Sequence, residues 1–339
     1  MSSNGAKPKF AMYWAASCGG CEISVLNTHE KILDVDANFE VVFWPVAVDT
    51  KYKDVRAMED KSILLTLFNG SIRNSENEEI AHLLRRKSQI LVAFGSCACE
   101  GCIPGMANFS NAQDVIGTAF STITTDNPDN LRPHYQWDSP EGRIHIPEFA
   151  PLIRTLDQVV KVDYYMPGCP PESHQIAAVI DLVIQVLQGK AELPPAGTTI
   201  GAGNSTVCDE CNRRRDLKKI KQFNRIQEVN IDPEVCLLEQ GIVCNGIATR
   251  SGCTALCPSA GSPCMGCYGP ADGVLDYGAR LISAIASVID SNDPDEINQI
   301  LDGIPDPAGQ FYRFNLAGSV LRSGRDAFNH SADLANQVR

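Results

Sequence analysis

The chain has 339 residues, of which 44% are hydrophobic and 21% charged, so it is long enough to bury one large core or two smaller ones. Its formal net charge of −12 would repel the phosphate backbone of a nucleic acid. The one strongly basic run, at residues 213–221, is too short to reverse that repulsion. We therefore expect a globular protein that does not bind nucleic acid.

Membrane insertion and export also find no support in the sequence. The longest apolar stretches, at residues 41–48 and 176–187, fall well below the roughly 20 residues that a membrane-spanning helix needs. Residues 1–9 contain neither an apolar core nor a twin arginine. These features predict no membrane span and a cytoplasmic location. In a reducing cytosol, fourteen cysteines indicate metal or redox chemistry rather than disulfides.

Short β-rich runs alternate with helical segments up to about Leu193. We expect helices at residues 76–87 and from Pro170 to about Leu187, where the prolines fall in the first turn. The expected strands are residues 10–14, 39–48, 62–68, 90–94 and 162–166. Such alternation is typical of an α/β fold whose parallel sheet is covered by helices on both faces.

A Pro/Gly-rich segment at residues 193–204 separates this part from a cysteine-dense, loop-rich part. We place a domain boundary there, which gives domains 1–195 and 196–339. Residues 208–267 hold eight cysteines and few regular elements. Their fold is therefore expected to depend on metal staples more than on a hydrophobic core, with one amphipathic helix following at residues 272–289.

Cysteines of the first domain follow the predicted strands, and ligands of parallel sheets collect beyond the carboxyl ends of the strands. Cys18 and Cys21 follow the first strand, Cys97 the fourth and Cys169 the last. Twelve of the fourteen cysteines divide into three groups of four, the usual number of thiolates for an iron–sulfur cluster. The three sets are Cys18, Cys21, Cys97 and Cys169; Cys208, Cys211, Cys236 and Cys244; and Cys253, Cys257, Cys264 and Cys267.

Structural zinc is the competing interpretation of these sets. The Cys-x2-Cys pairs at 18/21, 208/211 and 264/267 would each suit a tetrahedral site of four thiolates. Zinc ribbons, however, usually bring two such pairs together, whereas each pair here is completed by single cysteines at irregular distances. A zinc-stapled scaffold protein remains the non-catalytic alternative.

Several motifs occur together in one order over nearly the whole chain. They are Cys18-Gly-Gly-Cys21-Glu22, Gly95-Ser-Cys97-Ala98, Pro167-Gly-Cys169-Pro-Pro171, Cys244-x-Gly246-x2-Thr249-x3-Cys253 and Cys264-Met-Gly-Cys267. In this order and spacing they resemble the small subunit of [NiFe] hydrogenases. The resemblance implies a flavodoxin-like domain that holds a proximal cluster near the Ni-Fe centre of a separate large subunit. A second, loop-rich domain would be stapled by the other clusters.

When the motifs are matched residue by residue, the resemblance implies that the set beginning with Cys18 holds the proximal cluster. The set that begins with Cys208 then holds the distal cluster, and the set that begins with Cys253 the medial cluster. Membrane-bound uptake relatives have a histidine where this chain has Cys208 and a proline where it has Cys257. Both differences favour three [4Fe-4S] clusters held by cysteine alone. At these two positions the chain is similar to the cytoplasmic heteromeric branch of the family. That branch includes methyl-viologen-reducing hydrogenases associated with heterodisulfide reductase.

The implied function is electron relay in a hydrogenase complex, with no dihydrogen chemistry by this subunit alone. Its partners would be the large subunit and an electron-accepting iron–sulfur or flavin subunit, for which a heterodisulfide reductase partner is one candidate. Deazaflavin-reducing and NAD(P)-linked branches remain open. So does the cluster subunit of a complex I-like oxidoreductase, although that relative has adjacent cysteines in place of Cys18-Gly-Gly-Cys21 and lacks the second domain.

Cys99 and Cys102 belong to none of the three sets. Both lie close enough to Cys97 in sequence to compete with it for the proximal cluster. The family motif places the ligand at Cys97, so we interpret Cys99 and Cys102 as small buried or free thiols.

Overall fold

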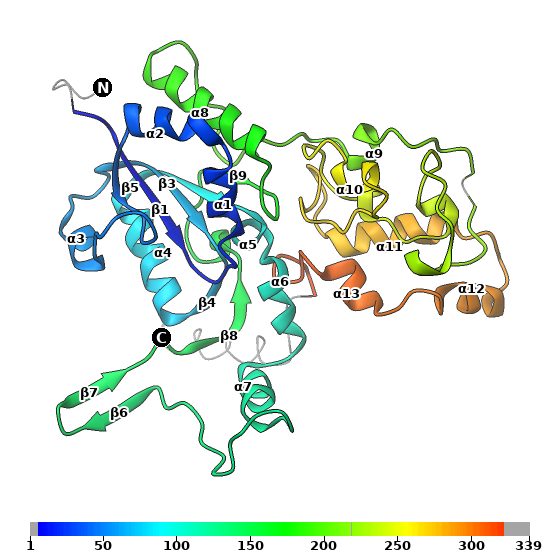
Figure 1. Ribbon diagram of the computed structural model, residues 1–339, viewed down its shortest axis with the longest axis horizontal. Helices are drawn as coiled ribbons and strands as arrows, with labels where there is room; N and C mark the ends of the chain where they lie inside the picture. The colour runs from blue at the N-terminus through cyan, green and yellow to red at the C-terminus, as the bar shows by residue number, and fades with distance from the viewer. Residues whose placement is uncertain (1–5, 218, 322–339) are drawn as a thin grey trace, which may run out of the picture.

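A five-stranded parallel sheet forms the centre of the first half of the chain (Figure 1). The computed structural model describes residues 6–217 and 219–321, so residues 322–339 of the expected second domain lie outside the described part. The strand order is β2-β1-β3-β5-β9, the flavodoxin-like order, which confirms the expected fold class. The strands are β1 (Lys9–Trp14), β2 (Glu40–Phe43), β3 (Ile63–Asn69), β5 (Ser88–Phe94) and β9 (Tyr164–Met166).

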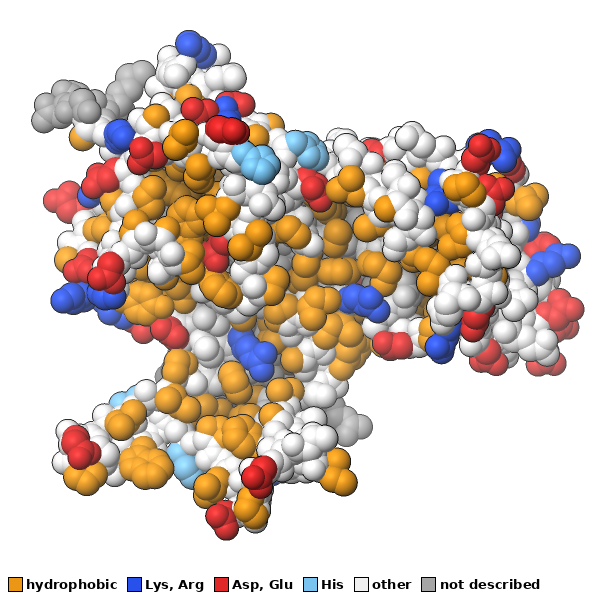
Figure 2. All heavy atoms as spheres, viewed as in Figure 1, with side chains coloured by type: hydrophobic (Ala, Val, Ile, Leu, Met, Phe, Trp, Pro, Cys, Tyr) orange, Lys and Arg blue, Asp and Glu red, His pale blue; other side chains and the backbone are white. Residues whose placement is uncertain are grey.

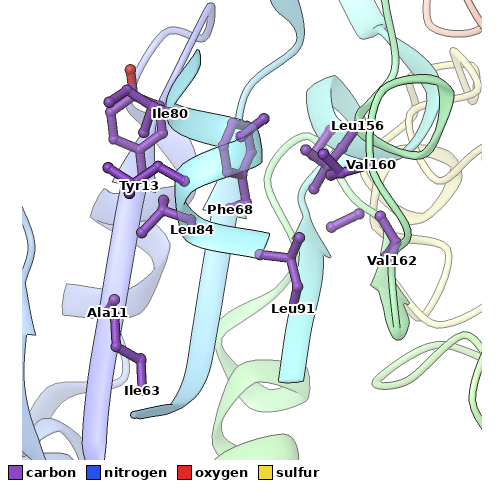
Figure 3. Packing of buried hydrophobic residues seen from close by; sticks show 14 of the residues in the cluster. Ala11, Tyr13, Ile63, Phe68, Ile80, Leu84, Leu91, Leu156, Val160 and Val162 are labelled. Carbon is purple, nitrogen blue, oxygen red and sulfur yellow. The ribbon is translucent and has the colours of Figure 1, made fainter. Parts of the chain in front are cut away.

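Side chains of successive residues in β1 enter two different cores, as the pleat of a strand requires. Phe10 and Met12 pack into a core that α1 (Gly20–Leu26), α2 (Ile32–Asn38) and α8 (Ser173–Leu187) cover. Ala11 and Tyr13 pack on the opposite face, under α3 (Tyr52–Ala57) and α4 (Ser75–Lys87). Figure 3 shows both residues with Ile80 and Leu84 of α4. Both faces of the sheet are therefore buried, and its ligand-binding edge is left at the carboxyl ends of the strands.

The second expected strand is shorter than predicted. It ends at Phe43 because the backbone turns at Trp44, whose carbonyl oxygen accepts from the N–H groups of Ala47 and Val48 at 2.8 and 2.9 Å. Pro45 has no N–H group to continue the ladder, so the apolar run from 44 to 48 cannot extend the strand.

A projecting arm between α7 (Ala112–Ser121) and the strand β8 (Phe149–Arg154) was not expected from the sequence. It carries the antiparallel hairpin of β6 (Gln136–Ser139) and β7 (Gly142–His145), which extends away from the sheet at the lower left of Figure 1. β8 pairs antiparallel with the short strand β4 (Ile72–Asn74) at the base of this arm. The first half is therefore not a purely parallel structure.

Short elements and loops dominate the cysteine-dense part, as expected. Its helices are α9 (Val207–Glu210), α10 (Leu256–Ser259), α11 (Tyr277–Val288), α12 (Pro294–Leu301) and α13 (Pro307–Tyr312). The last three pack around a core that includes Phe223, Leu281 and Ile285, so metal staples are not its only source of stability. α11 begins at Tyr277, later than predicted, because the Asp276 side chain caps it by accepting from the N–H of Ala279.

The remaining elements are short. They are α5 (Ser96–Glu100), α6 (Cys102–Gly105) and the 3-10 turns His29–Lys31, Met106–Phe109, Leu156–Gln158, Ile226–Glu228, Leu238–Gln240 and Asn245–Ile247. In the part of the chain that the structure describes, no helix combines the length and apolar character needed to cross a membrane.

Candidate iron–sulfur sites

The first cysteine set comes together at the carboxyl edge of the parallel sheet. Cys18 lies in the loop after β1, and Cys21 lies in the first turn of α1. Cys97 lies in the first turn of α5, directly after β5, and Cys169 follows β9. Burial raises the pKa of the Cys21 thiol, and the neighbouring thiols of Cys97, Cys169 and Cys18 raise it further. Four sulfurs from three separate loops thus share one site.

Only glycine fits at position 95, because a side chain there would clash with its neighbours and the backbone conformation disfavours other residues. Gly95 has a φ of +80°, and a Cβ atom there would lie 2.3 Å from Sγ of Cys21. The next residue, Ser96, holds two loops together, because its hydroxyl accepts from the N–H of Gly168 at 3.0 Å and donates to the carbonyl oxygen of Cys267. The loops after β5 and β9 are therefore fixed relative to each other and to the cysteine-dense part.

Cys102 is a fifth cysteine at this site. Its Sγ lies 3.6 Å from Sγ of Cys169, to which it donates, and it also hydrogen-bonds the thiol of Cys97. The hydrogen bond from Cys102 lowers the pKa of Cys169 to about 7 and also lowers the pKa of Cys97. Cys99 and Cys102 are both buried, as expected, with 7% and 1% of their surface exposed. Only Cys99 points away, donating to the carbonyl oxygen of Ala93 at 3.3 Å.

The second set lines a single pocket beside α9. All four of its cysteines contribute to the pocket wall, together with Arg213, Arg215 and Pro258: Cys208, Cys211, Cys236 and Cys244. Burial raises the pKa of Cys208 to about 12, and the thiols of Cys244 and Cys236 add to this shift. Residues that are up to 36 positions apart in sequence therefore line one pocket.

The third set lies between the other two. Burial raises the pKa of Cys267 to about 12, with further contributions from the thiols of Cys169, Cys253 and Cys257. The Cys264 thiol has a raised pKa as well, mainly through burial and then through the thiol of Cys244. The third set thus borders a cysteine of the first set on one side and a cysteine of the second set on the other.

Two direct contacts connect the sets in a row. The backbone of Cys169 forms a hydrogen bond with the thiol of Cys267, and the N–H of Cys264 donates to Sγ of Cys244 at 3.3 Å. The order in space is first, third, second, which differs from the order in sequence. Burial and neighbouring thiols oppose ionisation at Cys21, Cys208 and Cys267, and a soft cation would offset that cost because coordination favours the thiolate. The arrangement suits several metal groups spaced along one line.

Comparison with known proteins identifies the family. The chain is 38% identical over 320 residues to the iron–sulfur subunit of the F420-non-reducing hydrogenase of Archaeoglobus profundus, and the match covers 92% of this chain and 97% of the relative. The chain belongs to the small subunits of F420-non-reducing [NiFe] hydrogenases. The corresponding vhu hydrogenase subunit of Methanocaldococcus jannaschii, also named F420-non-reducing, is 36% identical, with 92% of this chain and 96% of the relative covered. This chain is therefore an iron–sulfur subunit of a [NiFe] hydrogenase complex, as its motifs suggested.

Two further matches are confined to part of the chain. The family model described as "NADH ubiquinone oxidoreductase, 20 Kd subunit" matches residues 18–183 of this hydrogenase small subunit, which is the flavodoxin-like part. A solved structure of an NAD+-reducing [NiFe]-hydrogenase in the H2-reduced state is 26% identical, with a TM-score of 0.46, over 56% of this chain and 96% of that chain. The complex I-like alternative thus shares only the first half of the chain, whereas the F420-non-reducing hydrogenase relatives extend through the cysteine-dense part as well.

Proposed function

We propose that this subunit relays electrons between the Ni-Fe site of a large subunit and an external acceptor, using three [4Fe-4S] clusters. The observation that carries the proposal is the row of three four-cysteine sets, in which Cys169 adjoins Cys267 and Cys264 adjoins Cys244. When bound, iron–sulfur clusters supply one-electron carriers whose potentials depend on ligands, burial and hydrogen bonds. The task of the protein chain is to hold such carriers in line and to exclude water between them.

Each set receives one role in this proposal. The flavodoxin-like domain, residues 1–195, holds the proximal cluster through Cys18, Cys21, Cys97 and Cys169. The domain of residues 196–339 holds the medial cluster through Cys253, Cys257, Cys264 and Cys267, and the distal cluster through Cys208, Cys211, Cys236 and Cys244. The contacts support this order, since the proposed medial set is the one that borders both others.

The chemistry of the site favours clusters over zinc. A zinc ion needs four sulfurs at about 2.3 Å from one point. Within residues 6–217 and 219–321, no three His, Cys, Asp or Glu side chains converge in the manner of a single-ion site. A cubane carries its four thiolates on separate iron atoms, so it does not require them to converge on one point.

The acceptor is proposed from the relatives' names. They are called F420-non-reducing, which disfavours the deazaflavin F420 as the direct acceptor of the present complex. We place the complex in the cytoplasm, where an iron–sulfur or flavin subunit, such as one linked to heterodisulfide reductase, would take electrons from the distal set. Splitting of dihydrogen would belong to the large subunit, so this chain purified alone should not reduce dyes with hydrogen.

Metal analysis of the anaerobically purified complex tests the proposal. Replacing one cysteine of each set, as in Cys21→Ala, Cys267→Ala and Cys208→Ala, should remove up to about four irons and four labile sulfides per variant. Cys99→Ala is the matched control and should keep the full content, because its thiol points into the core. Stoichiometric zinc in the wild-type subunit, or an iron content that none of the three variants lowers, would refute the three-cluster proposal.

A further inference from the structure

Cys102 is one of two buried thiols, with Cys99, that the proposed relay does not use. It is the first residue of α6, directly after Gly101, and only 1% of its surface is exposed. Its N–H donates to the carbonyl oxygen of Phe314 at 3.0 Å, which fixes the backbone beside the proximal set. Its φ of +47° lies in the left-handed region, which residues other than glycine rarely adopt. A side chain is thus held at this place despite a backbone that suits glycine.

The thiol of Cys102 is directed at two proposed proximal ligands. Sγ of Cys102 lies 3.6 Å from Sγ of Cys169, with Cys102 as the donor. The same thiol hydrogen-bonds the thiol of Cys97. The two partners lie in different loops, Cys169 after β9 and Cys97 after β5. The contacts therefore depend on the tertiary fold and not only on residues close to Cys102 in sequence. Cys97, Cys102 and Phe314 form one buried group, with Cys169 and Cys267 packed against it.

We infer that Cys102 is a hydrogen-bond donor that tunes the proximal cluster and not one of its ligands, an inference that rests on the proposed function. When Cys169 and Cys97 bind iron, the single S–H hydrogen of Cys102 would be donated to the sulfur of Cys169, its 3.6 Å partner, or shared with that of Cys97. A donor at a ligand sulfur stabilises the added negative charge of the reduced cluster, so it raises the reduction potential. An S–H group is a weak donor in water, but burial removes the competing water at this site.

The proposed hydrogen bonds would give the proximal cluster a higher reduction potential. Electrons leaving the Ni-Fe site meet the proximal cluster first, so a higher potential there favours its reduction by dihydrogen. Cys102 acts through Cys169 and Cys97, because the hydrogen bonds withdraw charge from their sulfurs. The neighbouring Cys99 cannot do the same, since its thiol donates to Ala93 in the core of the sheet.

The test uses the complete hydrogenase complex, purified without oxygen, with Cys102→Ala, Cys102→Ser and the control Cys99→Ala. Iron and labile sulfide are measured together with a redox titration followed by electron paramagnetic resonance. Cys102→Ala should keep full iron and sulfide, while the ratio of reduced to oxidised proximal cluster at a fixed potential falls roughly tenfold, equivalent to about 59 mV for one electron. Cys102→Ser, which keeps a donor, should restore most of that ratio, and Cys99→Ala should not change it.

Two results would overturn the inference in different ways. A proximal potential that is equal in Cys102→Ala and in wild type would show that no functional hydrogen bond exists. Loss of proximal iron in the same variant would show that Cys102 is a ligand. If Cys102→Ala fails to assemble, Cys102→Gly removes the same donor at a backbone position that suits glycine, and its titration decides the question. Absence of iron from the wild-type subunit would instead contradict the proposed function itself.

Discussion

Glu100, in α5 next to the proximal set, is a carboxyl group whose protonation should affect stability. Its pKa is raised from 4.5 to about 8, mainly by burial and then by the charge of Asp157, with Arg250 partly offsetting both. Between these two values the unfolded chain carries an ionised carboxylate while the folded chain keeps the proton. Folding therefore takes up a proton, and stability should fall as the pH rises from about 4.5 to about 8.

Replacing Glu100 by glutamine tests this pH dependence. Glu100→Gln should raise the apparent Tm relative to wild type by an amount that is small near pH 5, grows up to pH 8 and then stays constant. Each pK unit is equivalent to about 1.4 kcal/mol, so the gain should reach at least about 1 kcal/mol at pH 8. Thermal unfolding at pH 5, 6.5 and 8 measures it. Glu141→Gln, on the exposed hairpin turn, is the control, and a gain independent of pH would contradict the prediction.

A second prediction at the residue scale concerns Cys257. This exposed cysteine lies in the first turn of α10, where a helix tolerates proline. If Cys257 is a ligand as proposed, Cys257→Pro should convert the proposed medial [4Fe-4S] cluster to a three-iron form with a higher potential. Electron paramagnetic resonance of the oxidised complex should show a new signal, and hydrogen uptake with a high-potential dye should survive better than hydrogen evolution.

The neighbouring variant Leu256→Ala serves as the control for Cys257→Pro, because Leu256 is also exposed in the same short helix. It should leave the signal and the potential unchanged. A four-iron medial cluster at an unaltered potential in Cys257→Pro would mean that Cys257 is not a medial ligand.

At the scale of elements, Gln175 in the first turn of α8 joins the sheet domain to the cysteine-dense part. Its Nε2 donates to the carbonyl oxygen of Gly252 at 2.6 Å, and its Oε1 accepts from the hydroxyl of Tyr268 at 2.5 Å. These partners are the sequence neighbours of Cys253 and Cys267. One amide side chain, 4% exposed, therefore holds two loops of the proposed medial site against α8.

Removing that amide should loosen this junction. Gln175→Ala leaves the Tyr268 hydroxyl and the Gly252 carbonyl without this partner inside the protein, which costs about 1–3 kcal/mol for a buried polar group. We expect a lower apparent Tm and faster loss of iron to a chelator. Gln185→Ala, an exposed change on the same helix, should have neither effect. Equal chelation rates in the two variants would rule out the proposed role of Gln175.

The parallel sheet could be predicted from the sequence because its strands are buried on both faces and read as apolar runs, as in Ile63–Asn69. The hairpin arm could not, since Gln136–Ser139 is exposed and almost wholly polar. The grouping of twelve cysteines into three ligand sets came from their number and order, and it stays a prediction. The position of Cys102 did not, because it depends on Gly101, whose φ of +88° turns the chain back toward Cys169.

The whole molecule presents an exposed apolar surface beside the proximal set. Ile23 and Leu26 on α1 and Leu33 on α2 are 57%, 53% and 63% exposed, and Cys18 is exposed next to them. Figure 2 shows hydrophobic side chains gathered over the part of the sheet domain that carries α1. Apolar surface of this kind usually marks a protein interface. A proximal cluster must also lie close to the Ni-Fe centre, so we expect the large subunit to cover this surface.

A charge placed within this surface should weaken assembly of the complex. Ile23→Asp would bury a carboxylate against an apolar partner surface, which costs several kcal/mol when the charge is unpaired. Pull-down of the large subunit should therefore fall at least about tenfold relative to wild type, while the iron content of the separated small subunit stays the same. Leu301→Asp is the matched control, because Leu301 is exposed at the end of α12, far from α1 in Figure 1. It should bind the large subunit normally. Undiminished binding by Ile23→Asp would show that the large subunit docks elsewhere.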